Sequence, residues 1–598
     1  MISEDVKRQI GQHFVFGFQG YEPSESIVKL IRDYHVGSVI IFKRNIQSFP
    51  QLHNLIRSLQ KLAKDSGHSQ PLSIGIDQEN GLCAAFSSTS RTDAGTQFPG
   101  AMALGVTESP EVAQRVAYST GREMRLAGIN WAYSPVADVN SDPRNPVIGV
   151  RSYGADPKSV ASFVQAVSDG LVSAGIASCA KHFPGHGDTH VDSHLALPVI
   201  TKDFAKLEET ELVPFRCAIT NGIPSIMTGH MALPSLITAL GADSDINIPA
   251  SLSKGVTKTL LREKLGFKGV VVTDCLEMNA ISEGYGTGPG AVMALRAGAD
   301  VVMICHLMER QLAALEATYA AIEKREIGLD FLHTSGERIR SMKDAFCGRW
   351  EDVLEKPSSI EEILNLKKEN SLFSKQVYAL AIRWPSRPKD DRELYISAHS
   401  DVLVLTPQME SINAAVDDPQ DLIRTANGSI RNTAGPSYIA FATAIARRAP
   451  FSTHIVYSPL DAVEGSSLSE TLTKSILSAH AVVFTTRNAH QASWQMVVLR
   501  RVADAIRVAS QDERNKAIKL IVVASCAPYD HSLLASDDRT KDLPCLCTYE
   551  FTKPALEEAA AKIYGEELAS QRRPSTFSTK PLPCKQICLS KKVCAVVL

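Results

Sequence analysis

Short apolar runs alternate with amphipathic helical patterns through the N-terminal half of the chain. Helix-period segments, such as residues 111–128 and 157–175, separate most of these runs. The pattern predicts a (β/α)8 TIM-like barrel, with a doubly wound parallel sheet as the structural alternative. Eight runs have the length and composition of buried strands: residues 13–18, 37–42, 72–77, 129–136, 177–183, 225–230, 269–274 and 299–304.

Polar and charged residues gather at the carboxyl ends of several predicted strands: Asp77, Lys181, His182, His230 and Asp274. In a (β/α)8 barrel the carboxyl ends of all strands meet on one face, where the βα loops build the active site. This placement favours the barrel over the doubly wound sheet. It also predicts that the functional site lies on that face.

A second series of strand-like runs follows the barrel, after charged helical stretches at residues 337–346 and 356–384 and a break at 385–394. These runs predict a smaller α/β sandwich-like domain; they are residues 401–407, 453–459, 481–488 and 518–525. We therefore divide the chain into a barrel (1–345), a helical linker (346–392), an α/β sandwich domain (393–565) and an irregular tail (566–598).

Charge and hydropathy restrict the classes of partner. Lys and Arg number 63 against 65 Asp and Glu, a net charge of −2, so we expect no nucleic-acid partner. No apolar run approaches the ~18 residues of a membrane-spanning helix, so we expect no membrane partner. Residues 1–18 contain early acids and no long apolar block, and cysteines such as Cys179 lie in apolar runs. These features predict a cytoplasmic protein without a signal peptide.

The stretch KHFPGHGDTHVDSHLALP, residues 181–198, combines histidines, acids and a lysine. On a helix, histidines spaced by four would share one face and could ligate a metal. Pro184, Gly185 and Gly187 oppose a regular helix here. The stretch is therefore also interpreted as a loop whose histidines cap backbone groups. The histidines are His182, His186, His190 and His194.

A catalytic interpretation of the same stretch rests on Asp192 and His194. A carboxylate that accepts a hydrogen bond from one ring nitrogen fixes the tautomer and raises the basicity of the other nitrogen. That other nitrogen can donate a proton to a leaving group and later accept one from water. The two residues thus form a candidate general acid/base pair.

Carboxylates at two strand ends provide further candidate chemistry. Asp274 closes the Val-rich run in VVVTDCLEMNAI (270–281), where it could cap the next helix or act as a nucleophile. Glu277 stands three residues later, at capping-box spacing. Asp77 could hold sugar hydroxyls, and Glu79 could form a capping bond or a salt bridge. Because retaining glycosidases pair a nucleophilic carboxylate with an acid/base group, the residues indicate a barrel hydrolase acting on a polar substrate.

Seven motifs in order across residues 5–345 resemble glycoside hydrolase family 3, in its β-N-acetylglucosaminidase branch, and the DQEN variant resembles fungal members. They are GIDQENG (75–81), FPGAMALG (98–105), WAYSPVADVNSDPRNPVIGVRSYG (131–154), KHFPGHGDTHVDSH (181–194), MTGHMALP (227–234), VVVTDCLEM (270–278) and ALRAGADVVMI (294–304). The resemblance implies a barrel followed by an α/β sandwich domain. It also implies an exo-acting, retaining hydrolase that removes terminal β-linked N-acetylglucosamine by double displacement.

The resemblance assigns roles to individual residues. It implies that Asp274 is the nucleophile, His194 the acid/base and Asp192 its partner. It makes His186 and His230 loop-organising residues, while Asp138, Asp188 and His190 remain unassigned. It implies a small-molecule carbohydrate substrate, with no metal and no organic cofactor. The residues that it implies bind sugar hydroxyls are Asp77, Arg151, Lys181 and His182.

One departure from the family pattern and several alternatives stay open. Leu82 and Cys83 stand in a segment where family members commonly carry an Arg. This departure leaves open how local charges are paired and whether the site accepts an anionic aglycone. Other specificities are a family 3 β-glucosidase or β-xylosidase, against which the Asp192–His194 pair argues, and a phosphorolytic variant. Two further alternatives are a sugar-binding protein that has lost catalytic activity and a metallohydrolase that uses the histidine loop. The sequence does not indicate an oligomeric state.

Overall fold

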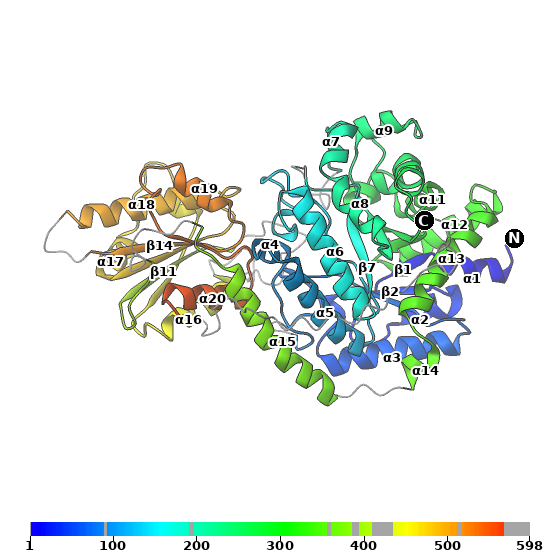
Figure 1. Cartoon of the computed structure of the whole chain (residues 1–598), viewed down its shortest axis with the longest axis horizontal. Coiled ribbons are helices and arrows are strands. Elements are labelled where there is room, and N and C mark those ends of the chain that lie inside the picture. Colours follow the sequence, from blue (N-terminus) through cyan, green and yellow to red (C-terminus); the bar gives the residue numbers. More distant parts are fainter. Residues whose placement is uncertain are drawn as a thin grey trace, which may run out of the picture.

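The computed structural model describes residues 2–88, 92–189, 197–355, 360–385, 394–409, 434–511 and 517–566. It shows a closed barrel and a separate parallel-sheet domain, joined by a long helix (Figure 1). Among these described residues, no helix has the length and apolar character needed to cross a membrane.

Eight parallel strands close the barrel in the order β1-β10-β9-β8-β7-β6-β3-β2. The barrel prediction is confirmed, because each predicted run contains one strand, and the doubly wound alternative is wrong, because β1 pairs with both β2 and β10. The strands are β1 (Phe14–Phe16), β2 (Ser38–Ile41), β3 (Ser73–Ile76), β6 (Trp131–Ala132), β7 (Ala177–Phe183), β8 (Ser225–Thr228), β9 (Val270–Cys275) and β10 (Val301–Ile304).

Both faces of the barrel wall are apolar, as expected for parallel strands covered on each side. Alternate residues such as Val15 and Val272 fill the interior, where the rings of Trp131 and Tyr133 pack against each other at a tilt of 56°. Their neighbours point outward against the helices. The interior is thus a packed core, and the charged side chains of the strands lie toward their carboxyl ends.

Helices surround the barrel, and local sequence sets their limits. Ser109 caps the helix at 110–127 through the Val112 amide, and Gly128 ends it in the left-handed conformation. The helices are α1 (Glu4–Gly11), α2 (Glu25–Tyr34), α3 (Phe49–Asp65), α4 (Ala101–Val106), α5 (Pro110–Ala127), α6 (Pro157–Ser173), α7 (Phe204–Glu209), α8 (Leu212–Thr220), α9 (Pro234–Leu240), α10 (Asn279–Ser282), α11 (Thr287–Ala297), α12 (Met308–Glu323) and α13 (Leu329–Phe346). A π-helical segment, Gly255–Lys264, precedes β9.

A short antiparallel hairpin follows β3 and lies over the barrel's carboxyl end. It consists of β4 (Gln78–Asn80) and β5 (Cys83–Ala84). Asn80 and Gly81 both have positive φ, which makes the tight turn. The turn places Leu82 against the apolar core of the second domain.

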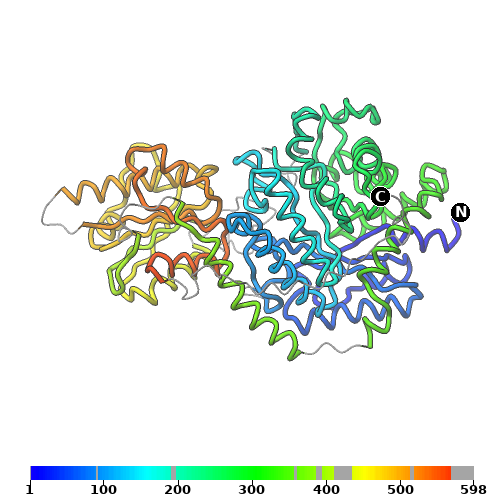
Figure 2. The backbone as a smooth tube through the Cα atoms, in the orientation of Figure 1, coloured from blue at the N-terminus to red at the C-terminus, as the bar shows by residue number. Residues whose placement is uncertain are grey.

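Helices α14 (Trp350–Leu354) and α15 (Ile360–Ala381) lead to the second domain. The trace in Figure 2 shows α15 running from the underside of the barrel to the second sheet. On its way α15 packs against α4 and α5, and then against α20 (Lys553–Ile563).

The second domain is a five-stranded parallel sheet with helices on both faces. Its order is β12-β11-β13-β14-β15, a doubly wound arrangement. The α/β sandwich prediction is confirmed, although the sequence pattern missed β15. Its elements are β11 (Val402–Pro407), α16 (Gly435–Ala446), β12 (Thr453–Tyr457), α17 (Glu470–Ser478), β13 (Ala481–Thr486), α18 (Trp494–Ala509), β14 (Lys519–Ala524), α19 (Tyr529–Ala535), β15 (Cys545–Cys547) and α20.

Candidate active site

Three predicted site residues meet at the carboxyl end of the barrel. Asp77 follows β3, Lys181 lies in β7 and Asp274 lies in β9. The buried thiol of Cys179 interacts with all three: burial, aided by the carboxylates of Asp77 and Asp274, raises its pKa to about 12 against the opposing effects of Ser225 and Lys181. The structure thus brings a cation and two acids together where the sequence placed them.

The ammonium group of Lys181 is buried between two carboxylates. Its Nζ lies 2.6 Å from Asp77 Oδ1 and 2.7 Å from Glu79 Oε1, and only 2% of its side chain is exposed. Burial would lower the pKa of Lys181, but Asp77 and Glu79 hold that pKa above its usual value. Lys181 is therefore a fixed positive charge, and Asp77, which is 30% exposed, is the member of the group that faces solvent.

Glu79 connects Lys181 to Arg151. The Arg151 guanidinium donates two parallel hydrogen bonds to Glu79, from Nε at 2.9 Å and from Nη2 at 2.8 Å. Burial opposes ionisation of Glu79, but Arg151 and Lys181 together hold its pKa well below the usual range. The sequence predicts a salt bridge or a capping bond for Glu79 without naming a partner. The structure shows salt bridges to Arg151 and Lys181.

His182 is oriented by Asp138, to which the sequence analysis gave no role. The imidazole Nδ1 lies 2.7 Å from Asp138 Oδ2, and Asp138 Oδ1 accepts the backbone N–H groups of His182 and His186 at 3.1 and 2.7 Å. The His182 Nε2 is 3.5 Å from Arg151 Nη2. Asp138 follows a barrel strand, so the rule that identified Asp77 and Asp274 could have found it.

Asp274 is part of β9 and is not a helix cap. Its Oδ1 accepts the backbone N–H of Cys275 at 2.7 Å, and the N-cap residue of α10 is Met278, which makes no side-chain cap hydrogen bond. The capping interpretation of Asp274 and Glu277 is therefore wrong. His230 supports this strand end, because its Nε2 lies 3.0 Å from the Cys275 carbonyl oxygen.

The predicted acid/base pair, Asp192 and His194, lies outside the described residues, as does His190. For the histidine-loop metal alternative, the described part of the loop supplies only His182 and His186. Their Nδ1 atoms already have partners, Asp138 for His182 and the Thr189 hydroxyl for His186. Burial lowers the pKa of His186 to about 4, so this ring is neutral at physiological pH.

The residues that depart from the family pattern are accounted for by packing. Leu82 is partly buried against the apolar core on one face of the second-domain sheet. Burial, aided by the nearby Glu79 carboxylate, raises the pKa of Cys83 to about 12. Neither residue supplies a cation, and in this chain Glu79 is paired by Lys181 and Arg151 instead.

The profile described as "Glycosyl hydrolase family 3 N terminal domain" matches residues 5–342. The chain belongs to glycoside hydrolase family 3. This family 3 chain is 35% identical to beta-hexosaminidase A of Pseudoalteromonas piscicida over 331 residues, which make up 53% of this chain and 54% of that relative. It is 33% identical to the beta-hexosaminidase of Thiobacillus denitrificans over 311 residues, 50% of this chain and 81% of that one.

Solved structures of the family match both domains of this chain. A glycoside hydrolase family 3 beta-N-acetylglucosaminidase from Paenibacillus sp. has a TM-score of 0.76 at 30% identity, over 95% of this chain and 98% of that one. A fungal multi-domain beta-N-acetylglucosaminidase that also has a glucosamine N-acetyltransferase region has a TM-score of 0.78 at 33% identity, over 94% of this chain and 59% of that one. The family 3 chain thus spans little more than half the length of the fungal protein and of the Pseudoalteromonas relative.

Proposed function

We propose that this family 3 chain is a retaining, exo-acting β-N-acetylglucosaminidase that removes terminal β-linked N-acetylglucosamine from glycosides or oligosaccharides. The observation that carries the proposal is the match through both domains to beta-N-acetylglucosaminidases at 30% and 33% identity. The strand-end group of Asp274, Asp77 and Lys181 supports it, because a sugar needs a carboxylate nucleophile beside fixed polar groups.

The chemistry is a double displacement. The Asp274 carboxylate attacks the anomeric carbon while His194 gives its proton to the glycosidic oxygen, so the bond to the aglycone breaks and the aglycone leaves as an alcohol. Water then loses a proton to His194 and attacks the same carbon, which releases Asp274 and leaves the sugar with retained configuration. In this proposal the role of Asp192 is to stabilise the imidazolium form of His194.

The charged network orients the sugar. Asp77 is partly exposed and keeps acceptor oxygens toward solvent while it pairs with Lys181. Glu79, which is buried, holds the Arg151 guanidinium in place by an ion pair. Asp138 holds the His182 ring in one orientation, with Nε2 turned toward Arg151. These groups are already ordered by the protein, so a sugar hydroxyl that binds them does not have to order them itself.

The proposal is tested by release of 4-nitrophenol from the β-N-acetylglucosaminide and the β-glucoside, with EDTA present. We expect the wild type to prefer the acetamido sugar and Asp274→Ala to lose about 10⁴-fold or more in kcat. Added azide should restore turnover of Asp274→Ala with an inverted glycosyl azide as the product, because a small anion can occupy the space of the lost carboxylate.

Other outcomes identify the alternatives. Preference for the glucoside indicates the β-glucosidase branch, and a sugar phosphate formed in phosphate buffer indicates phosphorolysis. Binding of N-acetylglucosamine without turnover of either substrate indicates a sugar-binding protein. His194→Ala should lose less activity on 4-nitrophenyl glycosides than on alkyl glycosides, since nitrophenol leaves without a proton donor.

A further inference from the structure

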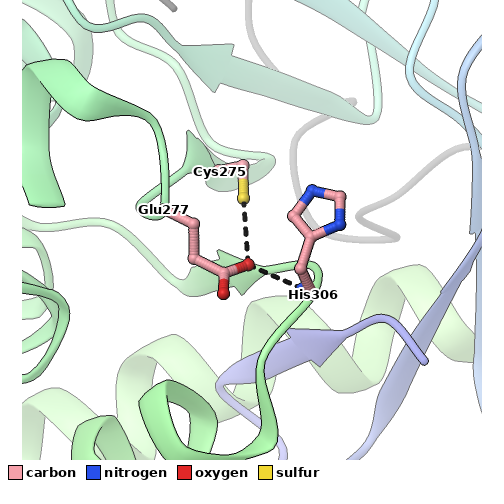
Figure 3. Close-up of side chains that lie close together, drawn as sticks. All are labelled: Cys275, Glu277 and His306. Atoms are coloured by element: carbon pink, nitrogen blue, oxygen red, sulfur yellow. Dashed lines mark hydrogen bonds between the residues drawn. The ribbon is translucent and has the colours of Figure 1, made fainter. Parts of the chain in front are cut away.

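A second cluster of reactive side chains lies beside Asp274 and has no role in the proposed mechanism. Cys275, Glu277 and His306 each offer a ligand atom, and the three atoms all lie within 4.8 Å of one another (Figure 3). Cys275 and Glu277 follow Asp274 at the end of β9, and His306 follows the neighbouring strand β10.

The donor set is sulfur, carboxylate oxygen and imidazole nitrogen. Zn²⁺ binds this combination with four-coordinate geometry at about 2.0–2.3 Å, whereas Mg²⁺ and Ca²⁺ prefer oxygen ligands. Ligand atoms of a tetrahedral zinc site are about 3.3–3.8 Å apart at those bond lengths. The three ligand atoms therefore have to move closer together, and His306, whose exposed ring lies beside Phe42, is the member that a rotation would move.

The backbone already holds the two strand ends together around this cluster. The Glu277 carboxylate accepts the N–H groups of Cys305 at 2.8 Å, His306 at 2.6 Å and Leu307 at 2.9 Å. It also accepts the Cys275 thiol at 3.8 Å. The protein therefore orders the Cys275 and Glu277 side chains before any metal arrives, which reduces the entropy cost of binding.

The charge around the cluster suits a divalent cation with a thiolate. Arg44 donates to the Cys305 carbonyl oxygen at 2.7 Å, and its guanidinium interacts electrostatically with Cys275 and Glu277. A Cys275 thiolate and a Glu277 carboxylate together neutralise a dication. With Arg44 included, the occupied site would carry one net positive charge.

We propose that Cys275, Glu277 and His306 form a binding site for a thiophilic divalent cation such as Zn²⁺, and that metal bound there inhibits the enzyme. Binding exchanges the Cys275 thiol proton, which goes to solvent, for a metal–sulfur bond. A dication one residue from Asp274 attracts the nucleophilic carboxylate and draws electron density from it, so attack on the anomeric carbon slows. The inhibitory part rests on the proposed role of Asp274, and the binding part does not.

The binding part is tested by titrating the apo protein with Co²⁺, whose thiolate complexes have an intense charge-transfer band, and by displacing the Co²⁺ with Zn²⁺. We expect one equivalent to bind with that band in the wild type. Cys275→Ser should lose the band, and His306→Asn should weaken apparent affinity more than about 10-fold, because even groups that merely orient metal ligands contribute roughly 10–100-fold. Matched controls that should behave as wild type are Cys217→Ser on α8 and His333→Asn on α13.

The inhibitory part is tested with 4-nitrophenyl β-N-acetylglucosaminide, each variant being compared with its own metal-free rate. Zn²⁺ should inhibit the wild type and both controls reversibly, and Cys275→Ser and His306→Asn should resist inhibition more than about 10-fold. If Zn²⁺ inhibits Cys275→Ser as strongly as the wild type, the metal acts elsewhere, for instance at the histidine loop, and the proposal is overturned. If no variant hydrolyses the substrate, the proposed function fails, yet the Co²⁺ band still decides whether this site binds metal.

Discussion

At the scale of single residues, Lys181 shows how the site keeps a charge inside the barrel. A buried ammonium group without partners would lose its proton, but Lys181 lies within 2.7 Å of carboxylates on both Asp77 and Glu79. A buried cluster of ion pairs stabilises a fold little more than apolar side chains of the same volume would. Removal of one member nevertheless leaves the remaining charges buried without compensation. The presence of the cluster is explained by substrate binding better than by stability.

We therefore expect Lys181→Met to abolish sugar binding and to lower the free energy of unfolding by about 2–4 kcal/mol, since Asp77 and Glu79 both lose the Lys181 ammonium group while Glu79 retains Arg151. Urea unfolding and 4-nitrophenyl glycoside kinetics measure both effects. Lys7→Met, which removes the exposed pair with Glu4, should change unfolding by less than about 1 kcal/mol. Equal effects of the two substitutions would show that the buried network has no special role.

Asp138 belongs to the same scale because it acts through His182. Asp138→Asn retains the shape of the side chain but replaces one acceptor oxygen with an NH₂ group. That donor then faces either the backbone N–H groups that Oδ1 accepts or the imidazole nitrogen that contacts Oδ2. We expect KM to rise about 10-fold or more, with a smaller change in kcat, and unfolding to weaken by about 1–3 kcal/mol. A fall in kcat at constant KM would instead place His182 in the chemical step.

At the scale of elements, Asp300 fixes the outer helices to the amino end of the barrel. It lies directly before β10 and is fully buried. Arg262 of the π-helical segment donates to Asp300 Oδ2 at 2.5 Å, and Arg338 of α13 donates to Oδ1 at 2.7 Å. The Val271 amide in β9 also donates to Oδ2. One carboxylate thus ties three elements together at the end opposite the active site.

Asp300→Asn should lower the free energy of unfolding by about 3–5 kcal/mol, because two guanidinium groups lose their shared anion. The kcat of the folded fraction should not change, since the amino end of the barrel carries no catalytic group. Asp504→Asn, which breaks an exposed pair with Arg507, provides the control. A loss of kcat that follows the loss of stability would refute this separation of the two barrel ends.

Glu550 joins elements of both domains and should make stability depend on pH. It accepts the Gly100 N–H at the start of α4 at 2.6 Å and the Tyr378 hydroxyl of α15 at 3.0 Å. Burial raises its pKa from 4.5 to about 7. Between these values the folded chain alone holds the proton, so the free energy of unfolding falls as pH rises from about 4.5 to 7 and levels off above.

The contribution of Glu550 is roughly 3 kcal/mol over that pH range. Glu550→Gln should make the pH profile shallower by about 2 kcal/mol, the share of this contribution lost between pH 5 and pH 7.5, when unfolding by urea is measured at those two values. Burial also raises the pKa of Glu558 to about 7. The Glu550→Gln variant should therefore retain the part of the pH dependence that Glu558 contributes. Unchanged slopes in Glu550→Gln would mean that the carboxyl group is ionised at the interface throughout.

At the scale of the whole molecule, the strand pattern predicts the barrel, the second sheet and the carboxyl-end location of Asp77, Lys181 and Asp274. This is possible because strand ends are local features, and the topology of a barrel brings them together. The pairs Glu79–Arg151 and Asp138–His182 escape such a prediction, since 72 and 44 residues separate their members. The three-residue β15 is too short to give a strand pattern.

The same limit explains the domain interface. Met102 and Ala103 look like ordinary helix residues of α4, yet they belong to the apolar cluster between the second sheet and helices α17 and α18. Leu82 similarly contacts the cluster on the sheet's other face. Asn140, two residues from Asp138, donates to the Tyr529 hydroxyl of α19 at 2.5 Å. The second domain therefore contacts the segments that carry the site residues.

We expect this interface to make the two domains unfold together. Met102→Glu places a carboxylate among apolar side chains of the second domain, at a cost of several kcal/mol, while each domain keeps its own core. Calorimetry should show one transition for the wild type and two for Met102→Glu, with a lower kcat/KM because the hairpin carrying Glu79 loses its support. Leu329→Glu, at a site of α13 that is 58% exposed, should retain the wild-type profile. A single transition at a lower Tm in Met102→Glu would mean that neither domain is stable without the other, and the barrel alone would then not suffice for activity.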